Sequence, residues 1–381
     1  MLIIDDITII ICVTLLVLSV LSVLLDTFFR KLPESMETAD NSALKPVSVI
    51  VISDNNSREI SLNLPYIFSQ DYPAGFEVIV VVSKNEDETD DALKPFAQYP
   101  NFYTTFVPDT SRYMSRRKLA VTLGVKAAKN EWILLTDAEC KPATDQWLKT
   151  MAQNGAEDGV DMVIGYSNYA DDARHFHVFD RLHREYAMMC EACKGKAYST
   201  AGNNLMFRKS MFMEGDGFRG NLKYIRGEYD FLVNKYANGD NVRTETSLDA
   251  QLTEIAPSSK KWRNKQLFYL ETRKHLAGGL AHRLRFNADM TLLHLTLWLN
   301  IASIAFAAIT LRWLILAVAV LMIILTFVVR TMSAKRVIRR FNANIPLWKA
   351  VPFELRLIWS NLLNMLRYKA ADRKDFISHK S

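Results

Sequence analysis

The feature with the clearest potential for chemistry is Asp137-Ala138-Glu139, which follows the apolar run Trp132-Ile133-Leu134-Leu135. Such a run is typical of a buried strand, so the two carboxylates stand at the end of a core strand. Alternation along an extended backbone points residues 137 and 139 to the same side, where both can reach one cation. Mg²⁺ and Mn²⁺ prefer oxygen ligands and keep several waters, so two carboxylates and a diphosphate suffice. On spacing alone, a capping Asp137 beside a solvated Glu139 explains the pattern equally well.

A second acidic pair, Glu228-Tyr229-Asp230, opens the helical pattern that continues with Phe231. Acidic side chains in the first turn of a helix are stabilised by its dipole, so capping is one explanation. The functional alternative is a general base that removes a proton from an acceptor hydroxyl.

A basic triplet, Arg116-Arg117-Lys118, begins the helical stretch that precedes the Asp137 strand. It either forms a solvated face or directs one side chain toward a diphosphate.

The elements that must position these residues follow an alternating pattern. Strand-like runs occupy residues 47–52, 76–82, 101–107 and 131–136, and helical stretches follow the first three. Near-continuous Val and Ile runs separated by helices predict a doubly wound, mostly parallel α/β sheet. Ligands bind such sheets outside the carboxyl ends of the strands, which is where Asp137 and Glu139 are expected.

Three apolar runs are long enough to cross a membrane as helices, at residues 7–25, 290–311 and 313–329. No small-residue cleavage site follows the first, which favours a retained anchor over a signal peptide. The last two form a hairpin of spans or a shallow re-entrant pair. Because Lys and Arg gather beside one end of each span, the positive-inside rule predicts a multi-pass protein of the inner (cytoplasmic) membrane with a cytoplasmic middle region.

The predicted organisation has four parts. They are an anchor (1–30), a cytoplasmic α/β domain (45–277), two transmembrane helices (288–330) and a basic amphipathic cytoplasmic tail (331–381).

The net charge of +6 lies mainly in the tail, where residues from Arg330 onward hold 12 Lys and Arg against three acids. That segment is +9 and leaves about −3 for the remainder, which argues against a nucleic-acid groove. Tail residues Leu355, Trp359 and Leu362 fall at helical spacing, which predicts an amphipathic helix on an anionic leaflet. Of the four cysteines, Cys190 and Cys193 form a C-x-x-C without a second pair to complete a zinc set.

Four segments together resemble membrane-anchored family-2 glycosyltransferases of the GT-A fold. They are 47-VSVIVISDNN-56 with 65-PYIFSQDYPAGFEVIVVV-82, 115-SRRKLAVTLGVKAAKNEWILLTDAECKP-142, 201-AGNNLMFRKSMF-212 and 227-GEYDFLVN-234. The resemblance implies an inverting hexosyl or N-acetylhexosaminyl transfer from a nucleotide-diphosphate sugar. The implied acceptor is lipid-linked or otherwise presented at the membrane, in cell-envelope glycan or glycolipid synthesis.

The resemblance also implies roles for single residues. Asp137 and Glu139 match the D-x-D motif that holds Mg²⁺ or Mn²⁺, with Asp137 also at the donor. Glu228 matches the catalytic base, and Asp230 is the second acid. The weaker matches are Asn55 in the nucleotide-facing loop, Lys118 near the donor diphosphate, and Trp262 and Arg273 on the acceptor or diphosphate side.

The chain departs from that pattern at several positions. Glu139 stands where Asp is usual, Asn56 where Glu is common, and Ser83 where an acid contacts the nucleoside. The Q-x-x-R-W motif is not present as such. These departures favour an alternative, a catalytically degenerate membrane subunit or sugar-binding protein. A nucleotidyltransferase is less supported because no Gly-rich phosphate loop follows the first strand.

Overall fold

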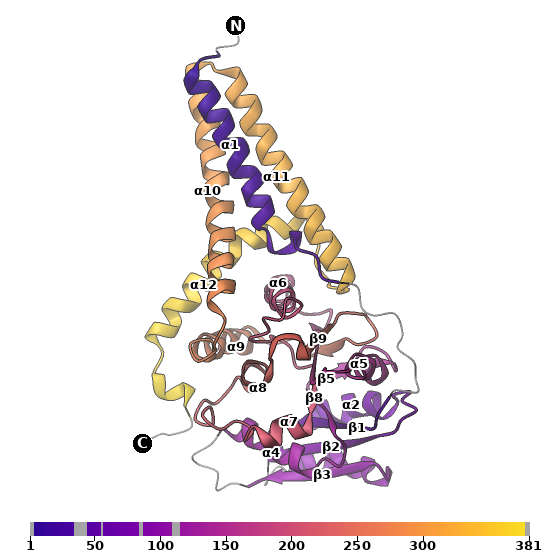
Figure 1. Cartoon of the computed structure of the whole chain (residues 1–381). Coiled ribbons are helices and arrows are strands. Elements are labelled where there is room, and N and C mark those ends of the chain that lie inside the picture. Colours follow the sequence, from indigo (N-terminus) through magenta and orange to yellow (C-terminus); the bar gives the residue numbers. More distant parts are fainter. Residues whose placement is uncertain (1–3, 34–43, 55, 84–86, 109–114, 378–381) are drawn as a thin grey trace. The chain divides into compact units, whose positions relative to one another are not determined.

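The computed structural model describes residues 4–33, 44–54, 56–83, 87–108 and 115–377 (Figure 1). The chain divides into two compact units. One contains Leu32–Gly279 and Asn364–Ser381, and the other contains Met1–Lys31 and Leu280–Leu363.

The first unit is built on a seven-stranded sheet with the strand order β3-β2-β1-β4-β8-β6-β9. Its strands are β1 (Val47–Ile52), β2 (Phe76–Ser83), β3 (Phe102–Val107), β4 (Trp132–Asp137), β6 (Met162–Gly165), β8 (Leu205–Arg208) and β9 (Val242–Glu245). The first four are mutually parallel, whereas β8 runs antiparallel to β4 and to β6. The predicted α/β class and the parallel-rich sheet are confirmed. The antiparallel β8 was not expected, because its four residues are too short to show a strand period.

Strands β1, β2 and β4 are buried on both faces, which explains their continuous apolar sequences, whereas the edge strand β3 is partly exposed. The helices of this half are α2 (Ser57–Phe68), α3 (Asp87–Leu93), α4 (Arg116–Ala127) and α5 (Trp147–Gly155). Val49 and Val51 share one apolar cluster with α2 and α5, while Ile50 points to α4 on the opposite face (Figure 1). Gly124 lets α4 approach closely, since a Cβ there would lie 2.6 Å from Cγ2 of Ile50.

A second, three-stranded sheet has the order β5-β10-β7, made of Cys140–Pro142, Leu252–Glu254 and Ser167–Tyr169. The remaining helices of the unit are α6 (His175–Ala192), α7 (Lys209–Glu214), α8 (Glu228–Tyr236) and α9 (Ser259–Thr272). Short 3-10 helices are η3 (Lys94–Gln98), η4 (Gly239–Asn241) and η6 (Arg373–Phe376). Because β5 begins directly after Glu139, the D-x-E residues form the junction between the two sheets.

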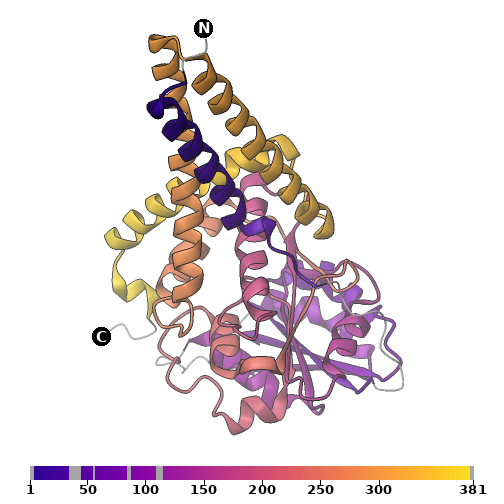
Figure 2. The same cartoon turned by 45° about the horizontal axis from the view of Figure 1, so that its top comes forward.

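The second unit contains three helices that are long and apolar enough to cross a membrane, namely α1 (Asp6–Leu25), α10 (Leu280–Thr310) and α11 (Trp313–Arg340). They lie side by side (Figures 1 and 2). The hairpin between α10 and α11 turns at Leu311, and Arg312 there pairs with Asp5, with Nη1 2.5 Å from Oδ1. Helix α10 begins ten residues before the predicted apolar run, and α11 ends eleven residues after its run. The polar residues there also form backbone hydrogen bonds of a helix, so the helix is longer than the apolar run. The 3-10 helices η1 (Thr27–Phe29) and η5 (Leu347–Lys349) and the amphipathic helix α12 (Ala350–Ala370) complete the described helices.

A fully buried guanidinium ties the segments of this unit together. Arg330 on α11 donates from Nε to Oε2 of Glu354 at 2.7 Å and from Nη2 to Oδ1 of Asp289 at 2.9 Å. It also donates to the carbonyl oxygen of Ser22 at 2.7 Å, and Asp26 lies 3.7 Å away. One cation therefore serves three buried carboxylates.

Arg330→Met is expected to destabilise the protein by about 3–5 kcal/mol, because it leaves buried carboxylates without their counter-ion. Thermal unfolding of the detergent-purified protein measures the effect. The matched control is Arg339→Met, which removes an exposed guanidinium from the same helix and is expected to change the midpoint little. Equal midpoints for the two variants would contradict the role of Arg330.

Candidate active site

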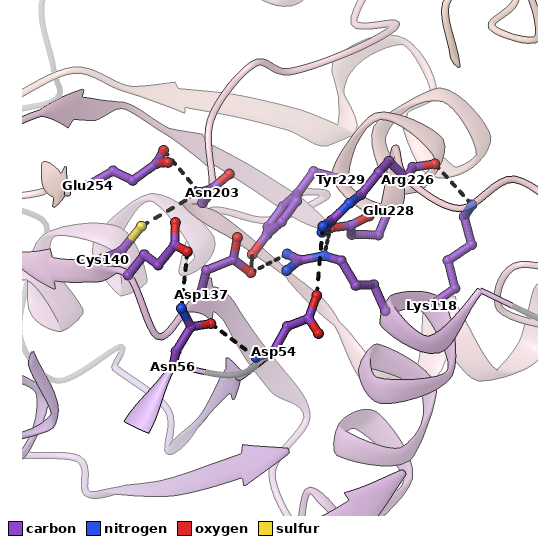
Figure 3. Close-up of polar contacts among 12 residues, drawn as sticks. Asp54, Asn56, Lys118, Asp137, Cys140, Asn203, Arg226, Glu228, Tyr229 and Glu254 are labelled. Carbon is purple, nitrogen blue, oxygen red and sulfur yellow. Dashed lines mark hydrogen bonds and ion pairs between the residues drawn. The ribbon is translucent and has the colours of Figure 1, made fainter. Parts of the chain in front are cut away.

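A cavity of about 510 Å³ opens in the first unit at the carboxyl ends of β1 and β4. The acids that line it include Asp137, Glu139, Glu228 and Asp230, so the structure brings both predicted acidic pairs together. Figure 3 shows polar contacts of Asp137 and Glu228.

Asp137 is the last residue of β4 and pairs in register with Ile52 of β1. Its Oδ1 accepts hydrogen bonds from Nη2 of Arg117 at 2.5 Å and from the hydroxyl of Tyr229 at 3.2 Å. Burial raises the pKa of Asp137, and the guanidinium of Arg117 opposes that shift. Asp137 is therefore a buried carboxylate kept in place by a cationic neighbour.

Glu139 lies two residues further on, at the start of the second sheet. Its Oε1 accepts a hydrogen bond from Nδ2 of Asn56 at 3.1 Å, and it pairs with the ammonium of Lys261. Asn56 occupies the position where the family-2 pattern has Glu, and here it supports the second acid of the D-x-E motif. Asn55, predicted to face the nucleotide, lies outside the described residues.

Glu228 begins α8 immediately after Gly227, whose φ of 89° lies in the left-handed region. A Cβ at Gly227 would also lie 2.5 Å from Cγ2 of Thr272, so only glycine fits this turn. Oε1 of Glu228 accepts from Nε of Arg117, while its buried Oε2 has no hydrogen-bond partner among the described residues. Burial raises the pKa of Glu228, but Arg117 and Arg226 outweigh burial and lower it overall. Arg117 and Arg226 thus favour the ionised form of Glu228, and its Oε2 is not engaged by any described donor.

Asp230 stands in a different electrostatic environment one half-turn along the helix. Its Oδ1 accepts a hydrogen bond from the hydroxyl of Ser199. Burial raises the pKa of Asp230 to about 7, partly offset by Ser199. The two acids of this pair are therefore expected to titrate in well-separated pH ranges.

Of the basic triplet, Arg117 lines the cavity, where it bridges Asp137 and Glu228. Lys118 is fully buried and points elsewhere, donating to the carbonyl oxygens of Tyr224 and Arg226. Successive residues of a helix point roughly 100° apart, so the two side chains cannot face the same site. Lys118, predicted to lie near the diphosphate, is not among the residues that line the cavity.

Helix α9 gives a similar result for the predicted acceptor-side residues. Trp262 is buried and stacks on His177 with ring centroids 4.4 Å apart, and Arg273 is the C-cap of the helix. Neither lines the cavity, whereas Lys261 does. The sequence contains a signal for Lys261, since Ser258-Ser259-Lys260-Lys261-Trp262 has the spacing of Q-x-x-R-W with Ser for Gln and Lys for Arg.

The other end of the cavity is lined by polar side chains, several of which hydrogen-bond to one another. Nη2 of Arg184 donates to Asp180 at 2.7 Å and to Gln266 at 2.5 Å. The guanidinium of Arg184 also lies 4.6 Å from the ring centroid of Tyr269. This end can offer hydrogen bonds and an aromatic face to a second substrate.

Within the described ranges, no three His, Cys, Asp or Glu side chains cluster as a metal site. The two carboxylates of the D-x-E motif nevertheless fit a hard divalent cation that takes its other ligands from a diphosphate and water.

Comparison with protein families decides the class of this chain. The family described as glycosyl transferase family 21 matches residues 7–359. The chain belongs to glycosyl transferase family 21. The expectation of family 2 is therefore wrong, although a glycosyltransferase is confirmed. The acidic motifs that led to that expectation indicate the chemistry of a site at the edge of a sheet. They do not distinguish between glycosyltransferase families that have the same kind of site.

A solved structure with a TM-score above 0.5 has a similar fold at low sequence identity. Mannosyltransferase PcManGT from Pyrobaculum calidifontis, in complex with GDP-Man and Mn2+, is 18% identical with a TM-score of 0.53, covering 94% of this chain and 97% of that one. S. aureus TarS 1-349 with UDP-GlcNAc is 14% identical with a TM-score of 0.44, covering 85% and 92%. The UDP complex of that protein is 17% identical with a TM-score of 0.41, covering 58% and 63%. No curated protein sequence matches the chain.

Proposed function

We propose that this member of family 21 is a membrane-bound, GT-A type enzyme that transfers a sugar from a nucleotide-diphosphate donor to a lipid-linked or membrane-presented acceptor with inversion. One observation carries the proposal. A single cavity holds an acidic D-x-E pair at the carboxyl edge of the sheet and, linked to it through Arg117, Glu228, whose buried Oε2 has no hydrogen-bond partner among the described residues.

The donor half of the cavity suits a diphosphate. Asp137 and Glu139 are the residues that would hold Mg²⁺ or Mn²⁺. Bound there, the ion would neutralise charge that develops on the departing nucleoside diphosphate. Arg226, 3.7 Å from Asp54 at the end of β1, and Lys261 add positive charge on the same side. The likeness to PcManGT, whose structure contains GDP-Man and Mn2+, supports this assignment.

The acceptor half is organised around Glu228. The acceptor hydroxyl passes its proton to Oε2 of Glu228 as its oxygen bonds to the anomeric carbon. The bond from that carbon to the diphosphate oxygen breaks on the opposite face, which gives inversion. Arg117 keeps Glu228 ionised before the transfer, so the base is ready at neutral pH.

Membrane presentation of the acceptor is supported by the three helices that are long and apolar enough to span a bilayer. Basic residues near one end of each favour a catalytic domain on the cytoplasmic side of the inner membrane.

The alternative is a non-catalytic sugar-binding or scaffold protein. It is favoured by the protein's own cations, since Arg117 and Lys261 already neutralise Asp137 and Glu139. In an enzyme, these two ion pairs must break when the metal and the diphosphate bind.

Calorimetry and turnover distinguish the two. We expect the purified protein to bind GDP or UDP more tightly with Mn²⁺ than with EDTA, and to hydrolyse or transfer from at least one of a panel of nucleotide sugars. Metal-dependent binding without turnover on any donor, with membrane-lipid extract as acceptor, would favour the scaffold. Absence of both binding and turnover would contradict the proposed enzyme.

A further inference from the structure

Residues 364–377 pack on the first unit, although more than 80 residues separate them from its main part. Phe376 is buried, with its ring centroid 5.4 Å from that of Phe268 and 5.3 Å from that of Tyr368. The backbone joins as well, because Ile377 forms an antiparallel bridge with Tyr224. The amide of Ile225 donates to the carbonyl oxygen of Phe376 at 3.0 Å.

A second set of contacts runs through the end of α9. The hydroxyl of Tyr368 donates to Glu271, and the ammonium of Lys274 lies 4.2 Å from the centroid of the Tyr368 ring. Glu271 is also 3.1 Å from Nε2 of His275, and Nδ1 of that ring is 3.1 Å from the hydroxyl of Tyr224. The 364–377 segment thus reaches Tyr224 both directly and through α9.

The segment held in this way, residues 222–227, leads directly into Glu228. From its other side, Ser115 donates its hydroxyl to the carbonyl oxygen of Ile225 at 2.7 Å. Lys118 donates to two further carbonyl oxygens of the segment, including that of Arg226 at 3.1 Å. Residues 222–227 are therefore clamped between α4 and the 364–377 segment.

Glycines lie near both ends of this segment. Gly220 and Gly227 have φ values of 92° and 89°, in the left-handed region that glycine adopts readily. Between them lies Arg226, which lines the cavity and lies 6.0 Å from the ring centroid of Phe268. Loss of one side of the clamp would let Arg226 and Glu228 move out of register with the D-x-E acids.

We propose that Tyr368 and Phe376 are positioning residues for sugar transfer, acting through segment 222–227 on Arg226 and Glu228. The inference rests on the proposed role of Glu228. The end of the amphipathic helix α12 and the segment that follows it then form part of the catalytic architecture, in addition to any contact that α12 makes with lipid. A displacement of about 1 Å at a reacting group can cost on the order of 10²-fold in rate.

The test compares full-length variants. Phe376→Ala is expected to lower kcat by about 10- to 100-fold, with a smaller rise in the KM for the donor because Arg226 lies on the diphosphate side. Tyr368→Phe, which loses the hydroxyl's hydrogen bonds to Glu271 and from Lys274, is expected to move kcat in the same direction by less. Phe376→Leu, which keeps apolar volume, should recover most of the rate. Asp375→Ala removes an exposed neighbouring side chain and should behave as wild type.

Hydrogen exchange gives a readout that does not depend on turnover. Peptides that cover residues 222–227 are expected to exchange faster in Phe376→Ala than in wild type or Asp375→Ala, while β1 and β4 stay protected. Unchanged exchange in that segment, or a general gain throughout the sheet, would overturn the inference. An inactive wild type with locally faster exchange in the variant would instead count against the proposed function alone.

Discussion

Glu228→Gln is expected to lower kcat by about 10²- to 10⁴-fold, which is the usual contribution of a general base. The amide keeps the shape of the side chain, and its oxygen can still accept from Nε of Arg117, but it cannot take a proton from the acceptor. Binding of nucleoside diphosphate with Mn²⁺ should be retained, because the D-x-E acids are intact. Turnover at saturating donor, with calorimetry as the control, measures both quantities.

The pH dependence identifies which acid is the base. The pKa of Glu228 is lowered by Arg117 and Arg226, so Glu228 stays ionised until the pH falls below the ordinary Glu value of about 4.3. If Glu228 is the base, kcat/KM is expected to be flat from about pH 5 to neutrality. Asp230, with its pKa raised to about 7, would instead give a rate that falls as the pH drops through 7. Such an acid limb in wild type, abolished by Asp230→Asn and retained in Glu228→Gln, would contradict the assignment.

The sheet and the three long apolar helices were predictable because each has a local sequence pattern. Continuous apolar runs encode strands that are buried on both faces, and charge-free runs of about 20 residues encode helices of bilayer length. The D-x-E pair was also predictable from local sequence, since Asp137 ends β4 and Glu139 comes two residues later. Its placement at the carboxyl edge then follows from the parallel sheet alone.

The pairing of side chains in the cavity was not predictable, because it depends on rotation and on distant segments. Lys118 and Arg117 are neighbours in a basic triplet, and only the angle of α4 against the sheet decides which one meets Asp137. Glu228 lies 111 residues from Arg117 along the chain. The contact of Phe376 with Phe268 has no sequence signal either, because a single aromatic residue in a basic tail carries no period.

Asp137→Asn has the second large expected effect, which is loss of the metal-dependent part of donor binding and turnover. A Lewis-acid ion contributes several kcal/mol to stabilising the leaving group, so kcat/KM is expected to fall by at least about 10²-fold. Glu139→Gln should cost less, because Oε1 of Glu139 is already engaged by Asn56 and Lys261. Asp145→Asn changes an exposed acid outside the cavity and serves as the matched control.

The two acids also differ in what the metal must displace. At Asp137 the ion competes with one guanidinium that keeps a second partner, Glu228, so Arg117 can release Asp137 without becoming an unpaired buried charge. Mn²⁺ titrations monitored by nucleoside diphosphate affinity measure this exchange. We expect wild type to gain affinity with Mn²⁺ and Asp137→Asn to show none of that gain. Equal Mn²⁺ dependence in the two proteins would place the ion elsewhere, and Asp137 would then serve only as the counter-ion that orients Arg117 toward the base.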